Sequence, residues 1–213
     1  MKQFFVPLVF LTLIGATISG QAQEQAAPVA IAQLDKDRLL SRLAELKPFQ
    51  AEKAGLGAGS SFSVTKEEFR NSLLFLSPER TDEVMKDFGM ALGFLFKDKN
   101  QLLTLTQWRD HGSAKNFMQV RYELWHLTDE EYRGHLKNVN YEELDIGEGE
   151  KVLLTRKTLE QSGQRQDITM FISARKAYFF ECTLMGAYES SEVKKLILQV
   201  WKIVESEVKK GQR

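Results

Sequence analysis

One short segment carries three residue types that together occur in hydrolase active sites: Asp110, His111 and Ser113 in DHGS. Such a site needs a nucleophile, a base that takes its proton and an acid that orients the base, all converging in space. Residues this close in one short loop rarely converge in that way. The sequence also lacks the Gly-x-Ser-x-Gly turn that exposes a catalytic serine. We interpret the segment as a hairpin loop of turn-forming residues and predict no catalytic residues.

Metal ligands are the next candidates. His111, His126 and His135 do not form a His-Glu-x-x-His motif, and a single cysteine cannot provide a zinc-binding pair. The acidic segment EELDIGEGE, residues 142–150, is rich in the oxygen ligands that calcium prefers. Its spacing differs from that of an EF-hand loop, and its glycines also suit a tight turn before a strand. We predict no metal, with a calcium site at this turn as the alternative.

Glycine-rich segments do not predict a nucleotide cofactor. Gly147 and Gly149 lack the third glycine and the following helix of a dinucleotide-binding fingerprint. Gly55, Gly57 and Gly59 are not followed by the Lys-Ser/Thr pair of a phosphate-binding loop. We therefore predict no cofactor.

Cys182 is the only cysteine, and it lies in the segment YFFECTLMG. Alternation along residues 176–185 places Cys182 on the same face of a strand as Phe180 and Leu184. A thiol in apolar surroundings has a raised pKa and is a poor nucleophile and ligand. We predict that Cys182 is a small hydrophobic residue of the core.

Residues 117–126, FMQVRYELWH, alternate between apolar and polar, which predicts a half-buried strand. A helix would place Arg121 on an apolar face, so the strand is the preferred interpretation. On that strand Phe117 and Trp125 share the more exposed face with Arg121. We predict a partner-binding surface there, with cover by the preceding helices as the alternative.

The elements that position these residues follow from periodicity and capping signals. Residues 35–90 have helical patterns, with N-cap signals at Asp35, Thr65 and Ser77. Strands are predicted at 92–96, 101–108, 117–126, 151–161, 166–173 and 176–185, a short helix at 132–139, and a long amphipathic helix at 191–208. Short connections between successive strands favour an antiparallel meander. The expected fold is α+β: an antiparallel sheet of about six strands packed by helices, with a helical N-terminal region.

The first residues resemble an export signal. Lys2 precedes an apolar run from Phe4 to Ile18, and Gly20-Gln21-Ala22 is a suitable cleavage site. The expected organisation is a signal peptide at 1–22, a flexible leader at 23–34, a helical region at 35–90 and an α+β sheet domain at 91–213. Cleavage near Ala22 would produce a periplasmic or secreted protein. No later segment has the length and apolarity of a transmembrane helix.

The composition excludes some partner classes. Removal of Lys2 changes 29 basic residues to 28, against 29 acidic ones, so the mature chain has a formal charge of −1. A nearly neutral chain argues against nucleic acid or an anionic membrane as the main partner. Three tryptophans and 14 phenylalanines provide material for an apolar pocket between sheet and helix, although an ordinary core uses the same residues.

Three segments of the second half, taken with the helix at its end, resemble the Mog1/PsbP-like domains, including small bacterial envelope proteins of the DcrB type. VRYELWHLTDEEYRGHL would be a strand that runs into a helix, and GEGEKVLLTRKTLE a strand after a turn. ITMFISARKAYFFECTL would be a strand pair, followed by the amphipathic helix EVKKLILQVWKIVESEV. The resemblance covers about residues 91–208 and lies in the order of elements. It implies a non-catalytic accessory or binding role and transfers no catalytic residues.

The sequence therefore predicts an exported, non-enzymatic accessory or protein-binding protein whose partner is another envelope protein. The alternative is a carrier that binds a hydrophobic small molecule between sheet and helix. A third possibility is a hydrolase whose site is dispersed along the chain.

Overall fold

A computed structural model describes residues 34–50, 59–73, 75–96, 101–147, 149–161 and 163–211. The predicted signal peptide and nearly all of the leader lie outside these residues, as does the turn 97–100. The helices are α1 (Lys36–Leu43), the 3-10 turn η2 (Lys47–Phe49), α2 (Lys66–Asn71), α3 (Pro78–Met85), α4 (His111–Glu131) and α5 (Ser190–Gly211). The strands are β1 (Ser60–Val64), β2 (Phe88–Phe96), β3 (Gln101–Trp108), β4 (Leu136–Gly147), β5 (Glu150–Gln161), β6 (Gln164–Arg175) and β7 (Tyr178–Met185).

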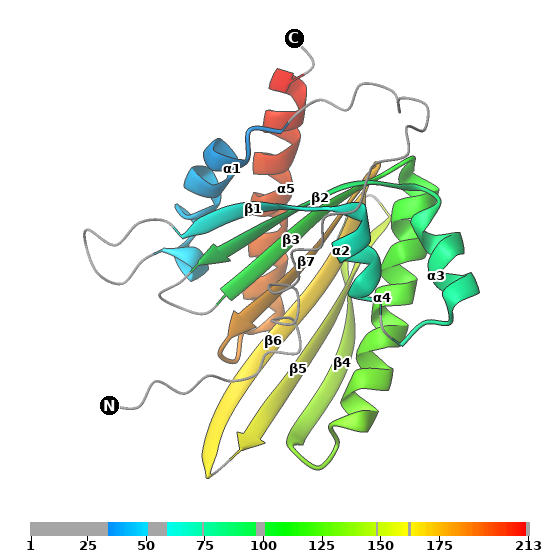
Figure 1. The fold of residues 1–213 in the computed structure, drawn as a ribbon. Helices are drawn as coiled ribbons and strands as arrows, with labels where there is room; N and C mark the ends of the chain where they lie inside the picture. Colours follow the sequence, from blue (N-terminus) through cyan, green and yellow to red (C-terminus); the bar gives the residue numbers. More distant parts are fainter. Residues whose placement is uncertain are drawn as a thin grey trace.

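The strands form one antiparallel sheet with the order β1-β2-β3-β7-β6-β5-β4. Its twist is visible in Figure 1, where β4 and β5 are rotated strongly relative to β1. The predicted α+β class, the antiparallel sheet and the helical N-terminal region are confirmed. The sheet has seven strands, and the N-terminal region adds β1 to its helices.

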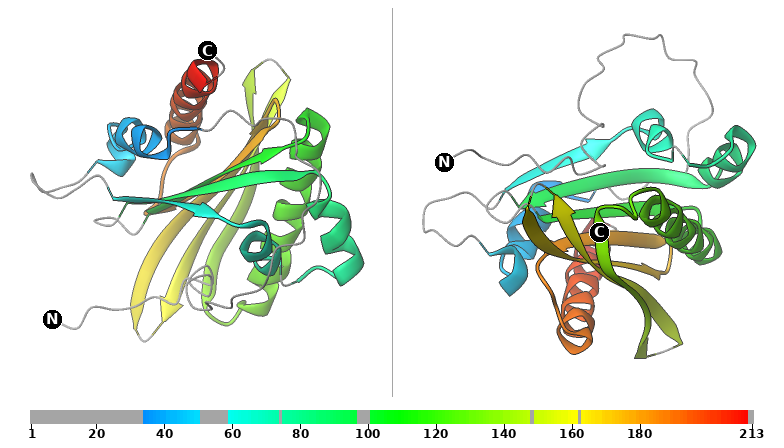
Figure 2. Two further views of the ribbon diagram at one scale, coloured as in Figure 1. Left: turned by 45° about the horizontal axis from the view of Figure 1, so that its top comes forward. Right: turned by 90° about the horizontal axis from the view of Figure 1, so that it is seen from below.

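Helices cover both faces of the sheet. α1 and α5 lie on one face and α4 on the other, as Figures 1 and 2 show. The α5 side of the sheet contributes Phe94, Phe171 and Phe180 to a core with Trp201 of α5. The α4 side contributes Trp108 and Phe179 to a second core. Alternation along each strand therefore supplies two apolar layers, because both faces of the sheet are packed.

Local signals at the helix ends agree with the structure. The Asp35 side chain accepts a hydrogen bond from the Arg38 amide, and the Ser77 hydroxyl accepts one from the Arg80 amide. Thr65 and Glu68 form the capping box that starts α2. These side chains satisfy amides that have no partner inside the helix, which fixes where each helix begins.

The strand predicted at 117–126 is wrong, because these residues belong to α4. The buried positions Phe117, Val120, Arg121, Leu124 and Trp125 follow the helical spacing i, i+3, i+4, i+7, i+8. The objection to a helix was the charge of Arg121 on its apolar face. That charge is paired with Glu181 of β7, so the helix can bury it.

The helix predicted at 132–139 is also wrong. Thr128 lies inside α4, and its hydroxyl donates a hydrogen bond to the Leu124 carbonyl. α4 ends at Glu131, and β4 begins at Leu136 and pairs with β5. The sequence pattern of β4 is irregular because its ladder contains register shifts between Lys137 and Asn140 and between Asp145 and Gly147.

Cys182 lies on the predicted face of β7, fully buried in the core beneath α5. Burial, together with the nearby Glu181 carboxylate, raises the pKa of the Cys182 thiol well above its usual value. We expect the native protein to resist a thiol reagent that labels it completely in denaturant, measured by mass spectrometry over one time course. Equal labelling rates in the two conditions would contradict this register of β7.

Candidate functional site

The hairpin loop predicted for DHGS is wrong: the segment forms the start of α4, and it does not form a catalytic triad. Asp110 is the N-cap, and its carboxylate accepts hydrogen bonds from the Ser113 amide at 2.8 Å and the Ser113 hydroxyl at 2.9 Å. Nδ1 of His111 instead lies 3.0 Å from the Lys176 carbonyl oxygen. Ser113 is thus hydrogen-bonded to the carboxylates of Asp110 and Asp87. The His111 imidazole instead contacts the turn between β6 and β7. This arrangement caps a helix and does not activate a nucleophile.

Asp110 gives the stability a predictable dependence on pH. The hydrogen bond from the Ser113 amide, with those from the Ser113 hydroxyl and Arg109, lowers the pKa of Asp110 to about 2. In the unfolded chain an aspartate titrates at about 3.9, so this contribution is complete above that pH and disappears as the pH falls through about 2. We expect the difference in Tm between wild type and Asp110→Asn to be constant above pH 5 and to shrink on acidification. A difference that grows on acidification would contradict this assignment.

The residues predicted to form a partner surface are buried. Phe117, Arg121 and Trp125 are 1%, 6% and 3% exposed, respectively. Phe117 stacks on Trp108 with ring centroids 4.4 Å apart. These side chains therefore bind α4 to the sheet and are not available to an external partner. Cover comes from the sheet on which the helix lies and also from the preceding helices, since Phe69 of α2 contacts Phe117 with ring centroids 5.4 Å apart.

Arg121 and Trp125 converge on one carboxylate. The Arg121 guanidinium donates two hydrogen bonds to Glu181, at 2.9 and 2.7 Å, and the Trp125 indole donates a third at 3.0 Å. A bidentate pair of this kind fixes both the depth and the rotation of a helix on a sheet. The group is a structural lock between α4 and β7.

The acidic segment 142–150 forms the end of β4 and its turn into β5. Arg156 and Ser190 donate hydrogen bonds to the Glu142 carboxylate, and the bond from Arg156 is the main cause of the lowered pKa of Glu142. Glu143 forms an ion pair with Lys151. Among the described residues, no group of three His, Cys, Asp or Glu side chains is arranged to hold a metal ion. The carboxylates of Glu142 and Glu143 are therefore mainly partners for basic side chains.

Three aromatic rings meet at the surface where α4 reaches the edge of the sheet. Tyr122 and His126 of α4 and Tyr141 of β4 contact one another, with centroids 4.7, 5.8 and 3.8 Å apart for Tyr122–His126, Tyr122–Tyr141 and His126–Tyr141. His126 is exposed and the two tyrosines are partly exposed. Leu127 of α4, Tyr132 directly after α4 and Val139 of β4 are also exposed. We call these six residues the α4–β4 surface.

A buried polar group supports this surface from below. The Asp129 carboxylate accepts hydrogen bonds from the Tyr141 hydroxyl at 2.7 Å and from Nζ of Lys157 at 2.5 Å. Burial and the bond to Asp129 raise the pKa of Tyr141, so the phenol stays protonated and remains a donor. Asp129 therefore joins α4 to both β4 and β5 and holds the Tyr141 ring against His126.

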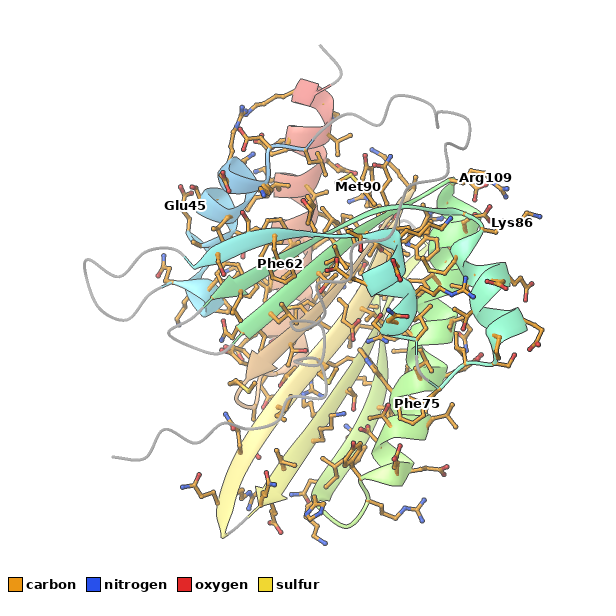
Figure 3. All side chains as sticks on the ribbon, viewed as in Figure 1. Glu45, Phe62, Phe75, Lys86, Met90 and Arg109 are labelled. Carbon is orange, nitrogen blue, oxygen red and sulfur yellow. The ribbon has the colours of Figure 1, made fainter. Side chains whose placement is uncertain are left out.

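Other exposed apolar side chains lie elsewhere. Figure 3 labels Phe62 of β1 and Phe75, which follows α2. The Phe62 ring lies directly over Gly93 of β2, its cross-strand partner, and fills the space that a side chain would occupy there. Leu198 is exposed on the outer side of α5. The α4–β4 surface differs from these positions because, among the described residues, three of the six exposed large apolar side chains lie between His126 and Tyr141 in the sequence, two of the three rings that contact one another.

Two hollows bear on the alternative of a hydrophobic ligand. A shallow one of about 390 Å³ lies on the outside of α5 and is lined by lysines, Leu198 and two polar residues. A second lies between the sheet and Leu34, beside Gln107, and has no room for a water molecule. Ligand pockets are usually concave, largely apolar and about 300–1,000 Å³ in volume. The first hollow is open and basic and the second is too small, so neither favours the carrier.

Sequence reasoning missed the α4–β4 surface because it divided α4 into a strand and a separate helix. A helix through residues 111–131 would have placed Tyr122 and His126 on one side at i, i+4, a usable signal. Tyr141 comes close to Tyr122 and His126 because β4 pairs with β5. No local sequence pattern predicts that pairing.

No helix in the described parts of the chain is long and apolar enough to span a membrane. Comparisons of the chain with protein-family models, curated proteins and solved structures found no match.

Proposed function

We propose that the chain is an exported, non-enzymatic accessory protein that binds another protein of the cell envelope. The observation that carries this proposal is the α4–β4 surface, where three aromatic rings contact one another, Asp129 holds Tyr141 by a hydrogen bond, and the chain between His126 and Tyr141 exposes three apolar side chains. Tyrosines are favoured at protein interfaces because each ring combines apolar area with a polar group. Export rests on the signal-like residues 1–22.

The fold resemblance adds support from the order of elements. The segments 147–160 and 168–184 and the final helix have the expected secondary structure, whereas the segment that starts at Val120 is helical where a strand was expected. We propose membership of the Mog1/PsbP-like domains on the strength of these remaining segments.

Two exposed leucines allow a matched test. Leu127 on α4 is 46% exposed and Leu198 on α5 is 42% exposed, and the two helices lie on opposite faces of the sheet. We expect a protein to co-purify from the native envelope with the tagged wild type and with Leu198→Glu, but not with Leu127→Glu. A charged side chain at the centre of an interface is strongly unfavourable, whereas on a free surface it has little effect.

Three results would contradict the proposal. The same proteins could co-purify with both variants, or the purified chain could carry a stoichiometric hydrophobic molecule in native mass spectra. Hydrolysis of a generic ester or phosphate substrate that is lost in His111→Ala would favour an enzyme instead.

A further inference from the structure

β4 forms the longer of the two edges of the sheet. It ends the strand order opposite β1, and in the sheet formed by the described residues only β5 pairs with it. β1 has 5 residues, while β4 has 12. Proteins commonly protect an edge by making it short or by placing proline or lysine on it. β1 follows the first of these devices, whereas β4 is long, contains no proline and has one lysine, Lys137, which lies before its first register shift.

Two irregularities limit the open edge to a defined segment. Register shifts occur between Lys137 and Asn140 and between Asp145 and Gly147, so the regular ladder covers residues 140–145. Nζ of Lys194 donates a hydrogen bond to the Asp145 carbonyl and so occupies a backbone acceptor at the C-terminal end of this segment. Six regular residues span about 20 Å, enough for one short extended peptide.

The charge of this segment selects among possible occupants. Residues 140–145, NYEELD, contain three carboxylates and no basic side chain; Glu142 and Glu143 form ion pairs with Arg156 and Lys151 of β5, while Glu143 and Asp145 are exposed. If a second copy paired antiparallel over the same six residues, Glu142 of each copy would face Glu143 of the other. Like charges directly opposite each other destabilise a strand pair. The edge therefore disfavours self-association and favours a basic strand.

We propose that β4 accepts an extended, basic segment of another protein as an eighth strand along residues 140–145. This inference rests on the proposed function and specifies its mode of binding. Main-chain hydrogen bonds would supply affinity, and side chains on alternate positions would supply specificity. On the α4 side a partner strand would contact Tyr141 and Glu143, whose neighbours on β5 are Thr155 and Leu153. The α4–β4 surface would then contact residues that flank the added strand.

Synthetic peptides test this inference with the full mature chain. The probe is a peptide of about nine residues that alternates lysine and valine, long enough to cover the regular ladder. One control replaces its lysines with glutamates, and a second retains the lysines but has proline at its centre, which cannot complete a ladder. Amide hydrogen exchange followed by NMR reports which backbone groups become protected. We expect the basic peptide to slow exchange within residues 140–145 about tenfold or more, with neither control doing so.

Charge reversal on the protein provides the second arm. Glu143→Lys should weaken the basic peptide about tenfold and allow the glutamate peptide to bind, since one attractive rim contact becomes repulsive. Glu45→Lys, in the turn after α1, changes the net charge equally and should leave binding unchanged; Glu45 is labelled in Figure 3 beside α1, on the opposite face of the sheet from α4.

Several outcomes would overturn strand addition: no binding of the basic peptide, protection elsewhere, equal binding of the proline peptide, equal loss in the two charge variants, or a dimer paired through β4. A native partner that requires Leu127 but leaves the β4 amides unprotected would retain the protein-binding proposal and remove strand addition. Co-purification that is insensitive to Leu127→Glu would instead remove the proposed function.

Discussion

Replacement of Glu181 by leucine is expected to lower the free energy of unfolding by about 3–5 kcal/mol. The variant leaves the Arg121 guanidinium buried without the carboxylate that receives two of its hydrogen bonds, and it also removes the acceptor of the Trp125 indole. Both side chains of the pair are almost completely buried, so water cannot replace the lost carboxylate. Chemical denaturation followed by circular dichroism measures the change.

The double variant Arg121→Met, Glu181→Leu is the control. Because a buried ion pair carries a large desolvation cost, its replacement by apolar residues of similar size often has little net effect. We expect the double variant to recover most of the stability lost by Glu181→Leu. If the double variant is as unstable as the single variant, the loss does not come from burying the Arg121 charge without its carboxylate. That result would contradict our explanation of the Glu181→Leu effect.

Replacement of Asp129 by leucine is expected to cost about 3 kcal/mol and to disrupt the α4–β4 surface. Lys157 would remain buried without its carboxylate, and the Tyr141 hydroxyl would lose its acceptor. The contact between Tyr141 and His126 should therefore loosen, which NMR shifts of the His126 ring would report. Binding of the native partner should weaken even at temperatures where the variant is folded.

Tyr141→Phe separates the two effects of Asp129. It removes one hydrogen bond and retains the ring, so we expect a loss of about 1 kcal/mol and partner binding close to wild type. A loss as large as that of Asp129→Leu would show that the hydroxyl, and not the Asp129–Lys157 pair, supports the surface.

The sequence predicted the sheet where periodicity was uninterrupted. β5, β6 and β7 are buried in alternating layers, and Cys182 has the neighbours expected on its strand. Helix starts at Asp35, Thr65 and Ser77 were predictable because a single side chain determines each. Each of these signals depends only on neighbouring residues, so it can be recognised in the sequence without knowledge of the fold.

The main failures concern contacts between residues that are far apart in the sequence and a strand whose pattern is irregular. Arg121 made a helix look impossible because its partner Glu181 is 60 residues away in the chain. β4 was missed because its ladder contains bulges and most of its residues are exposed. The candidate site was misplaced for the same reason, since α4 buries Phe117 and Trp125 and presents Tyr122 and His126 instead.

Site-specific cross-linking in living cells tests the central claim most directly. A photoreactive amino acid replaces Leu127 in one strain and Leu198 in another, so that two equally accessible helix positions on opposite faces are compared. Irradiation should produce a discrete cross-linked protein from position 127 and none from position 198. Cross-links of equal yield and identity at both positions, or none at position 127, would contradict a protein-binding role for the α4–β4 surface.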